Sequence, residues 1–280
     1  MLVSMNQVLK SAVDRQCCIG AFDTPSLEIL MAVLGAAEKR NEPVIVQHAQ
    51  LHECEIPIDV IGPIMVRMAE DALIPVCVML DHGEDIAYVK KALSLGFSAV
   101  MIDGSSLSYE DNVRLTREVT TLAKEYNADV EAEIGIVTGH EGRVFDIRDV
   151  SEAYTEPELA ARFVKDTGID ALAASVGTVH GFYATKPRLD FQRIRRIREL
   201  TGEPLVMHGG SGISVEDTQK AIRCGIRKIN YFSYMSNAGV KAVKELLEEK
   251  DVKYFHELAN AATLAMEKDV LQAMAMFALD

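Results

Sequence analysis

The stretch IPVCVMLDHGEDIAYVKKALSLGFSAVMIDG, residues 74–104, predicts a strand, a helix and a second strand in succession. Its ends, 74–81 and 99–104, are short apolar runs rich in β-branched residues. Between them Ile86, Val89 and Leu93 recur at helical spacing, and the glycine of LSLGF suits the position just after a helix. Two strands joined by a helix in this way form a right-handed βαβ unit with parallel strands.

The same alternation extends along the whole chain. Further strand-like runs are CCIGAF (17–22), PVIVQHA (43–49), DVEAEIG (129–135), ALAASVG (171–177), PLVMHGG (204–210) and KINYF (228–232). Eight strand–helix units in 280 residues fit an α/β fold of the (β/α)8 TIM-barrel type. An open doubly wound sheet is the alternative, but no glycine-rich dinucleotide-binding turn follows the first strand. No linker or charge block divides the sequence, so we expect one barrel domain, 1–280, with a C-terminal helical extension from about Tyr254 to Ala278.

The composition excludes several classes of protein. The chain is 49% hydrophobic and 25% charged, with a formal net charge of −13, as in soluble globular proteins rather than disordered or disulfide-rich chains. The acid excess argues against a nucleic-acid partner, and no apolar run approaches the roughly 18 residues that span a bilayer. The N-terminus lacks the layout of a secretory signal, and five cysteines match no paired zinc spacing. We therefore expect a cytoplasmic protein with reduced thiols, and no membrane or nucleic-acid partner.

Polar side chains gather where the predicted strands end. They are Asp81, His82, Asp103, Glu131, Glu133, His180, His208 and Asn230. The C-terminal ends of barrel strands form one rim, on which barrel enzymes build their active sites. Any one of the histidines could be structural, but three on one rim favour a catalytic metal site with an open fourth position.

The run HGGSGIS, 208–214, suggests a phosphate site. Glycines let backbone N–H groups approach an anion, and Ser211 adds a hydroxyl. Ser214 and Asp217 then have the spacing of a helix N-cap, which would bring a helix N-terminus close to the anion. A plain tight turn is the alternative, but barrels commonly bind phosphate after their seventh and eighth strands.

The whole chain resembles the class II, metal-dependent ketose-bisphosphate aldolases, especially the shorter branch that includes tagatose-bisphosphate aldolase. The matching stretches, in family order, are LDHGED (80–85), VMIDGS (100–105), VEAEIG (130–135), SVGTVHGFY (175–183), LVMHGGSG (205–212) and KIN (228–230). The resemblance implies reversible retro-aldol cleavage of a small phosphorylated sugar, a fructose- or tagatose-bisphosphate-like ketose phosphate, to dihydroxyacetone phosphate and an aldehyde.

The resemblance also implies roles for individual residues. The zinc ligands would be His82, His180 and His208. The catalytic carboxylates would be Asp81 as acid/base at the C4 hydroxyl, Glu133 beside the metal, and Glu141 in a mobile loop at the nucleophilic carbon. The dihydroxyacetone phosphate end would be held by Gly181, Gly209, Ser211, Asn230 and Ser233, with Gln47 also matching the family, and Asp103 matches a family acid of less clear role. A monovalent cation near the phosphate is implied in the same way.

Zinc would replace the Schiff-base lysine of other aldolases by polarising the substrate carbonyl. Lys228 is the one strand lysine on which a Schiff-base mechanism would depend. Side chains alternate along a strand, so Glu131 should point into the barrel with Glu133, and Lys228 with Asn230. Unpaired buried charge is costly, and we therefore predict a charge partner for Lys228 inside the barrel, with Glu131 as the candidate.

The sequence departs from the family on the aldehyde side. Asp23 and Ser26 replace two asparagines in AFDTPSLE, either as substrate contacts or in local turn and cap roles. The alternation of side chains along a strand, called parity below, puts Gln47 inward and His48 toward the helices, while His52 could reach the site from its loop. Phe232 changes the pocket wall, and Arg143 or Arg148 could serve the far phosphate. These changes suggest an aldolase for a non-standard aldehyde.

Two other functions remain open at this stage. A metal-dependent barrel hydrolase would lack its usual close histidine pair and leave the phosphate loop without a role. A catalytically silent metal- or sugar-phosphate-binding barrel would keep the fold, although Asp81 and all three ligands are present. We also expect a homodimer or homotetramer, with Phe255 and the last helix at a subunit interface.

Overall fold

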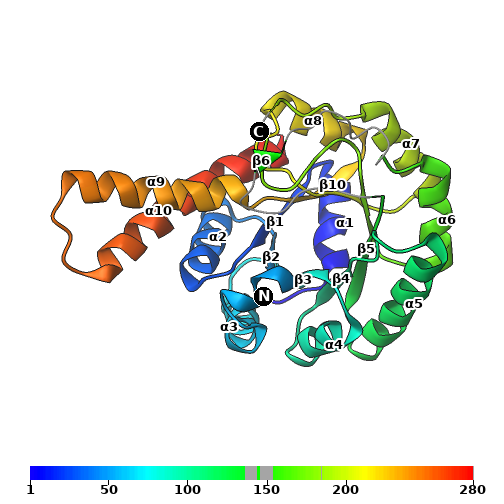
Figure 1. Ribbon diagram of the computed structural model, residues 1–280, viewed down its shortest axis with the longest axis horizontal. Coiled ribbons are helices and arrows are strands. Elements are labelled where there is room, and N and C mark those ends of the chain that lie inside the picture. The colour runs from blue at the N-terminus through cyan, green and yellow to red at the C-terminus, as the bar shows by residue number, and fades with distance from the viewer. Residues whose placement is uncertain (136–143, 146–153, 184, 280) are drawn as a thin grey trace.

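The computed structural model describes residues 1–135, 144–145, 154–183 and 185–279. Eight parallel strands close into a barrel in the order β1-β10-β9-β7-β5-β4-β3-β2 (Figure 1). These strands are β1 (Ile19–Asp23), β2 (Val44–Ala49), β3 (Val76–Gly83), β4 (Ala99–Ile102), β5 (Asp129–Ile134), β7 (Ala171–Ala174), β9 (Leu205–Met207) and β10 (Ile226–Asn230). The predicted TIM barrel and all eight of its strands are confirmed, and the closed strand order excludes the open sheet.

Helices cover the outside of the barrel. They are α2 (Leu27–Arg40), α3 (Ile58–Asp71), α4 (Ile86–Ser94), α5 (Tyr109–Glu125), α6 (Pro157–Thr167), α7 (Phe191–Thr201) and α8 (Val215–Cys224), with a 3-10 turn η1 (Gln50–Cys54) after β2 and a small parallel pair of β6 (Val144–Phe145) and β8 (Phe182–Tyr183). Ser26, Asp85 and Ser214 each accept a hydrogen bond from the backbone N–H three residues on, which defines where their helices begin. Gly168 and Gly225 end α6 and α8.

The strand alternation places two apolar layers on either side of the sheet. Inside the barrel, Ile45, Met79 and Met101 belong to one buried cluster with Met5 and Leu9 of helix α1 (Met5–Arg15). Helix α1 therefore closes the N-terminal end of the barrel with its apolar face. Polar side chains are left to fill the opposite end, where the strands finish.

Two long helices extend the barrel. Helices α9 (Ser233–Glu249) and α10 (Phe255–Ala278) run side by side, and Figure 1 shows their connected ends projecting well beyond the barrel as an arm. The C-terminal half of α10 returns to the barrel, where Met274 and Phe277 are buried. The helix predicted for about Tyr254 to Ala278 is thus present as α10. Among the described residues, no helix combines the length and apolar character needed to cross a membrane.

Candidate active site

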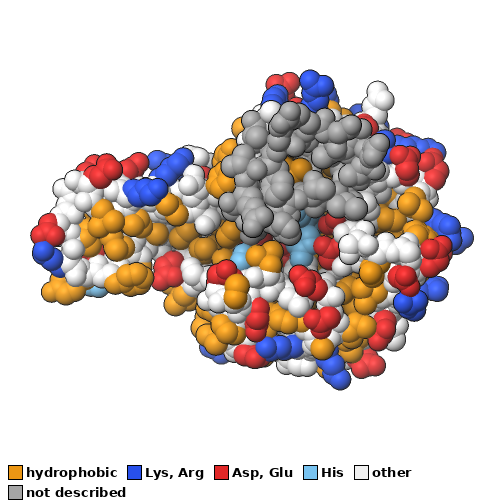
Figure 2. Space-filling view, in the orientation of Figure 1, with side chains coloured by type: hydrophobic (Ala, Val, Ile, Leu, Met, Phe, Trp, Pro, Cys, Tyr) orange, Lys and Arg blue, Asp and Glu red, His pale blue; other side chains and the backbone are white. Residues whose placement is uncertain are grey.

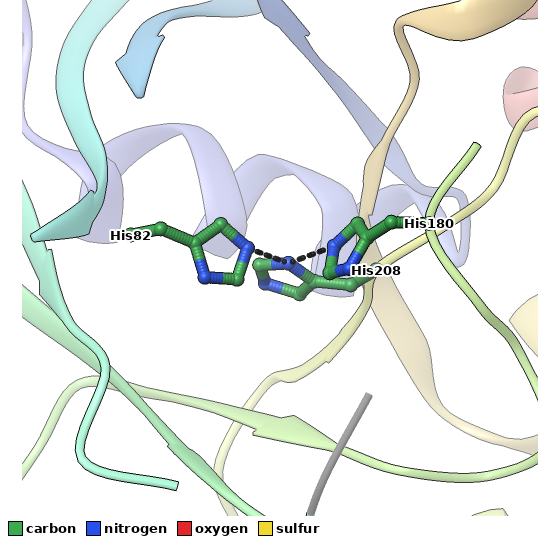
Figure 3. A group of neighbouring side chains, drawn as sticks. All are labelled: His82, His180 and His208. Atoms are coloured by element: carbon green, nitrogen blue, oxygen red, sulfur yellow. Dashed lines mark hydrogen bonds between the residues drawn. The ribbon is translucent and has the colours of Figure 1, made fainter. Parts of the chain in front are cut away.

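Three histidine side chains converge at the C-terminal mouth of the barrel. His82 comes from β3, His180 from the loop after β7, and His208 directly after β9 (Figure 3). His82 Nε2 lies 2.9 Å and His180 Nε2 lies 3.4 Å from His208 Nδ1. Three nitrogens bound tetrahedrally to zinc at about 2.05 Å would lie about 3.4 Å apart. Histidine is also visible at the centre of this face of the molecule in Figure 2.

A local irregularity brings His82 into this group. Alternation along a regular strand would turn His82 outward if Asp81 points inward. The backbone of His82 is instead left-handed, with φ of 42°, and the β3–β4 register shifts between Leu80 and Gly83. Such a conformation is costly for a non-glycine residue and is typical of functional sites. Two consecutive side chains, Asp81 and His82, therefore both reach the mouth.

Outer carboxylates determine which histidine nitrogens face each other. His82 Nδ1 lies 2.9 Å from Asp103 Oδ2, and His208 Nε2 lies 3.0 Å from Glu131 Oε1. An ionised carboxylate only accepts, so both of these ring nitrogens must donate. Neutral rings would then direct lone pairs from His82 Nε2 and His208 Nδ1 at each other across 2.9 Å. A cation between them removes this repulsion, and the residues therefore fit a zinc ion held by three imidazoles.

The charges around the three histidines favour the positive imidazolium form of one ring, His82, and the neutral form of the other two. Burial disfavours the charged form of His82, but the Asp81 and Asp103 carboxylates outweigh it and raise its pKa to about 10. Burial and then the positive His82 hold the pKa values of His180 and His208 well below the usual range. A metal ion would take the place of that proton, so acid should compete with metal binding.

Asp81 is held beside the histidines by two amides. Gln47 Nε2 donates to Asp81 Oδ1 at 3.0 Å, and Asn230 Nδ2 donates to the same oxygen at 3.1 Å. The other oxygen, Oδ2, lies 3.8 Å from His82 Nε2. Burial raises the pKa of Asp81, but the neighbouring positive charge, above all that of His82, lowers it by more, so its pKa lies below the ordinary value. Asp81 is therefore a fixed, ionised proton acceptor.

The predicted charge partner of Lys228 is confirmed. Lys228 Nζ lies 2.9 Å from Glu131 Oε2, and both side chains are fully buried. A lysine held as an ammonium ion by a buried carboxylate has no lone pair to attack a carbonyl, which argues against the Schiff-base alternative.

Glu133 is also buried, and one of its carboxylate oxygens lies within 4.8 Å of a ring nitrogen of His82 and of a carboxylate oxygen of Asp103.

The predicted phosphate loop has the backbone that its glycines suggested. Gly209 has φ of 64°, and a Cβ there would lie 2.2 Å from the carbonyl oxygen of Val179. The Ser211 hydroxyl accepts a hydrogen bond from Phe232 N at 3.1 Å, beside Ser233 at the start of α9. The N-cap residue of α9, Phe232, makes no side-chain hydrogen bond to the helix N-terminus. A helix N-terminus of this kind attracts anions.

The helix N-terminus that the sequence predicted beside the phosphate loop is capped by its own side chains. Ser214 and Asp217 form the expected cap of α8, and Lys186 lies 3.2 Å from the Asp217 carboxylate. The start of α9 rather than that of α8 is thus the better candidate for an anion. Tyr183 is a further residue at the loop that the sequence did not single out: its hydroxyl donates to the Gly209 carbonyl at 2.7 Å and accepts from Val179 N at 3.1 Å. Nothing in its local sequence distinguishes it from an ordinary aromatic residue.

The aldehyde-side residues divide into structural and mouth positions. Ser26 caps α2, and His48 turns outward to Tyr88 of α4 at 3.0 Å, as parity predicted. Asp23 is buried at the end of β1, in register with Gln47. His52 is buried in η1, with its ring centroid 5.4 Å from that of Phe232, so these two rings form one wall.

The structure describes most, but not all, of the remaining predicted site residues. Gly181 follows His180 with φ of 94°, a left-handed conformation that suits glycine. Glu141, Arg143 and Arg148 lie outside the described residues. The remaining predicted residues, Asp23, Gln47, Asp81, Glu133, Gly209, Ser211, Asn230 and Ser233, lie at the ends of the barrel strands or directly after them.

Comparisons with known proteins identify relatives of this chain. The family model for class II fructose-bisphosphate aldolase matches residues 3–280. A fructose-bisphosphate aldolase from Geobacillus stearothermophilus is 39% identical over 251 residues, covering 88% of this chain and 86% of that protein. A 6-phospho-5-dehydro-2-deoxy-D-gluconate aldolase from Halalkalibacterium halodurans is 36% identical over 283 residues, covering 99% and 96%.

A solved structure gives the same result in three dimensions. The YdjI aldolase from Escherichia coli K12 superimposes with a TM-score of 0.89 at 32% sequence identity, covering 99% of this chain and 97% of that one. The family match spans nearly the whole sequence. The chain therefore belongs to the class II fructose-bisphosphate aldolase family.

Proposed function

We propose that this aldolase uses one zinc ion, held by His82, His180 and His208, to cleave a ketose phosphate reversibly into dihydroxyacetone phosphate and an aldehyde. The observation that carries the proposal is the convergence of three imidazoles beside a fixed, ionised Asp81. Its place would be in carbohydrate catabolism. The family relationship supports retro-aldol chemistry independently of the metal.

The chain's own side chains would move the protons. A bound zinc ion would polarise the substrate carbonyl and stabilise the negative charge that develops on it. Asp81 would take the proton from the C4 hydroxyl as the C3–C4 bond breaks and its electron pair moves toward the carbonyl. Because Gln47 and Asn230 bind Oδ1, we assign the proton to Oδ2. Glu133 would remain beside the metal, and Glu141 is proposed for the proton at the nucleophilic carbon.

The dihydroxyacetone phosphate end would lie between the glycine loop and α9. Gly181 and Gly209 would let backbone N–H groups approach the phosphate. Ser211 and Ser233 would add hydroxyl groups beside the uncapped start of α9. A monovalent cation is proposed at the same place from family resemblance, and Asn230 would contact the sugar portion.

The residues on the aldehyde side of the mouth bear on which aldehyde is released. Relatives include both a fructose-bisphosphate aldolase and a 6-phospho-5-dehydro-2-deoxy-D-gluconate aldolase, so the family accepts different second halves. Here the wall carries Asp23 and the His52–Phe232 ring pair. A buried carboxylate repels anions and accepts bonds from hydroxyl groups. We propose an aldehyde that differs from simple glyceraldehyde 3-phosphate near Asp23.

A coupled assay for dihydroxyacetone phosphate tests these proposals together. The panel contains fructose and tagatose bisphosphates, ketose 1-phosphates and ketose phosphates with acidic tails, each with and without chelator. Chelator-sensitive release is expected, with a substrate other than the two bisphosphates turned over best. Equal or better turnover of a bisphosphate would refute the altered aldehyde. No release from any substrate despite stoichiometric zinc would favour a catalytically silent binding protein.

The arm supports a proposed homodimer or homotetramer. Phe255, Leu264 and Leu247 are 78%, 66% and 54% exposed, and Figure 2 shows hydrophobic side chains along the arm. Exposed apolar surface of this kind often marks a protein–protein interface. Light scattering on the purified protein would measure the subunit number. We further propose that residues 1–280 act as one domain in the cytoplasm, where the free thiols of the five cysteines would stay reduced.

A further inference from the structure

One buried lysine connects the two halves of the candidate site. Lys228 Nζ lies 2.9 Å from Glu131 Oε2 and donates to Asn230 Oδ1 at 2.8 Å. Glu131 accepts from His208 Nε2 at 3.0 Å, and Asn230 donates to Asp81 at 3.1 Å. A continuous path of contacts therefore runs from a proposed metal ligand, through Lys228, to the proposed proton acceptor. All five side chains are at most 4% exposed.

The chemistry of Lys228 determines how Asn230 is oriented. An ammonium group only donates hydrogen bonds, so Asn230 must turn its oxygen toward Lys228. Its amide nitrogen then faces Asp81 and donates to the carboxylate. The flipped amide would place NH2 against an ammonium and an oxygen against a carboxylate, and both contacts would be repulsive.

The same ammonium group holds the Glu131 carboxylate in place. An ionised Glu131 accepts the Nε2–H of His208, and that bond leaves Nδ1 as the ring nitrogen with a free lone pair. Carboxylates that hold a ligating histidine in this way orient the ring and raise its basicity. Lys228 thus acts on His208 through Glu131 and on Asp81 through Asn230.

Resting on the metal site proposed above, we propose that Lys228 and Glu131 form one positioning unit that aims His208 Nδ1 at the metal and fixes Asp81 through Asn230. Filling the barrel does not require such a pair. The buried positions in register with the pair are apolar, with Met101 beside Glu131 and Val206 beside Lys228. Replacing a buried ion pair with apolar residues is often neutral or stabilising, so an ion pair here is better explained by what it orients.

The test uses Lys228→Met and the doubly neutral variant Glu131→Gln/Lys228→Met in the full chain. The double variant leaves no unpaired charge, yet nothing then determines which amide end of Gln faces His208. We expect it to fold, as judged by near-UV circular dichroism, and to bind zinc about 10- to 100-fold more weakly in chelator competition. The visible spectrum of its cobalt form should change. At saturating metal, kcat should fall at least about 10-fold with KM within about threefold.

A control variant separates positioning from general destabilisation. Asn6 Nδ2 donates to Asp129 at 2.8 Å and to Asp170 at 2.7 Å, at the opposite end of the barrel. Asn6→Ala should lower the melting temperature without changing zinc affinity or the cobalt spectrum. A folded double variant with zinc affinity and kcat within about twofold of the unmodified protein would overturn the positioning role.

Nitrogen-15 NMR of the metal-free, unmodified protein gives a test that needs no variant to fold. His208 should carry its proton on Nε2, with Nδ1 unprotonated, and the opposite tautomer would overturn the proposal. Failure of the metal assignment looks different, because the unmodified protein itself would then bind no stoichiometric zinc. If it binds zinc normally and only the variants show no effect, the positioning unit alone is refuted.

Discussion

Replacing Asp103 with Asn should weaken zinc binding without unfolding the protein. The Asp103 carboxylate accepts from His82 Nδ1 at 2.9 Å, while its other oxygen accepts from Ser105 Oγ at 2.6 Å and Ser105 N at 3.0 Å. The amide keeps the shape of the side chain but removes the charge that favours the Nδ1–H form of His82. A hydrogen bond to a charged group contributes about 1.5–3 kcal/mol, which corresponds to a loss of affinity of roughly 10- to 100-fold.

The assay is zinc competition against a chelating dye at fixed pH, with Ser105→Ala as the matched control. Ser105→Ala removes one bond to Asp103 but leaves the carboxylate, the backbone N–H and His82 unchanged. Its zinc affinity should fall by less than about threefold. An Asp103→Asn protein that binds zinc within about twofold of the unmodified protein would refute the argument that outer carboxylates prepare the histidines for metal.

Three other changes test separate parts of the structure. Asp81→Asn keeps an acceptor for both amides but cannot take a proton, so kcat should fall about 10²- to 10⁴-fold, with zinc affinity nearly unchanged. Gly209→Ala places a Cβ against the Val179 carbonyl and should weaken zinc binding at least about 10-fold, whereas Gly168→Ala, with similar φ and no atom within 4 Å of its Cβ, should alter stability alone. Burial, more than any other cause, lowers the pKa of His48 to about 4, below its unfolded value near 6.5, so its stabilising effect is present above pH 6.5 and is lost as the pH falls toward 4. Urea unfolding of the unmodified protein should show that this group costs about 3 kcal/mol of unfolding free energy between pH 6.5 and 4. The loss should be smaller in His48→Gln, and parallel pH profiles for the two proteins would contradict the assignment.

The barrel could be predicted because its signals are local and repeated. Each strand is a short apolar run, and several of the following helices, such as α4 and α8, carry a cap or an ending glycine that the sequence displays directly. Parity then correctly placed Lys228 with Glu131 and turned His48 outward. These inferences depend only on the twofold period of a strand, which holds wherever the strand is regular.

The features of the site that the sequence did not reveal lie where the backbone is irregular or where the contacting residues are distant in sequence. Parity would have pointed His82 away from Asp81, and only its left-handed backbone brings both to the mouth. The start of α9, proposed above as the anion site, was not recognised in the sequence because it lacks the capping residue that makes the start of α8 easy to recognise. Tyr183 connects Val179 to Gly209 through contacts that no local pattern predicts.

The distribution of charge inside the barrel separates the requirements of folding from those of chemistry. Toward helix α1, the interior is filled by apolar side chains such as Ile45 and Met79, which need no partners. Toward the mouth, Glu131, Lys228 and Asp81 are buried, although each costs solvation free energy that its partners only partly return. Apolar replacements would satisfy the fold at least as well, so the free energy given up at this layer is better explained by the need to hold the proposed metal ligand and the proposed proton acceptor in fixed orientation.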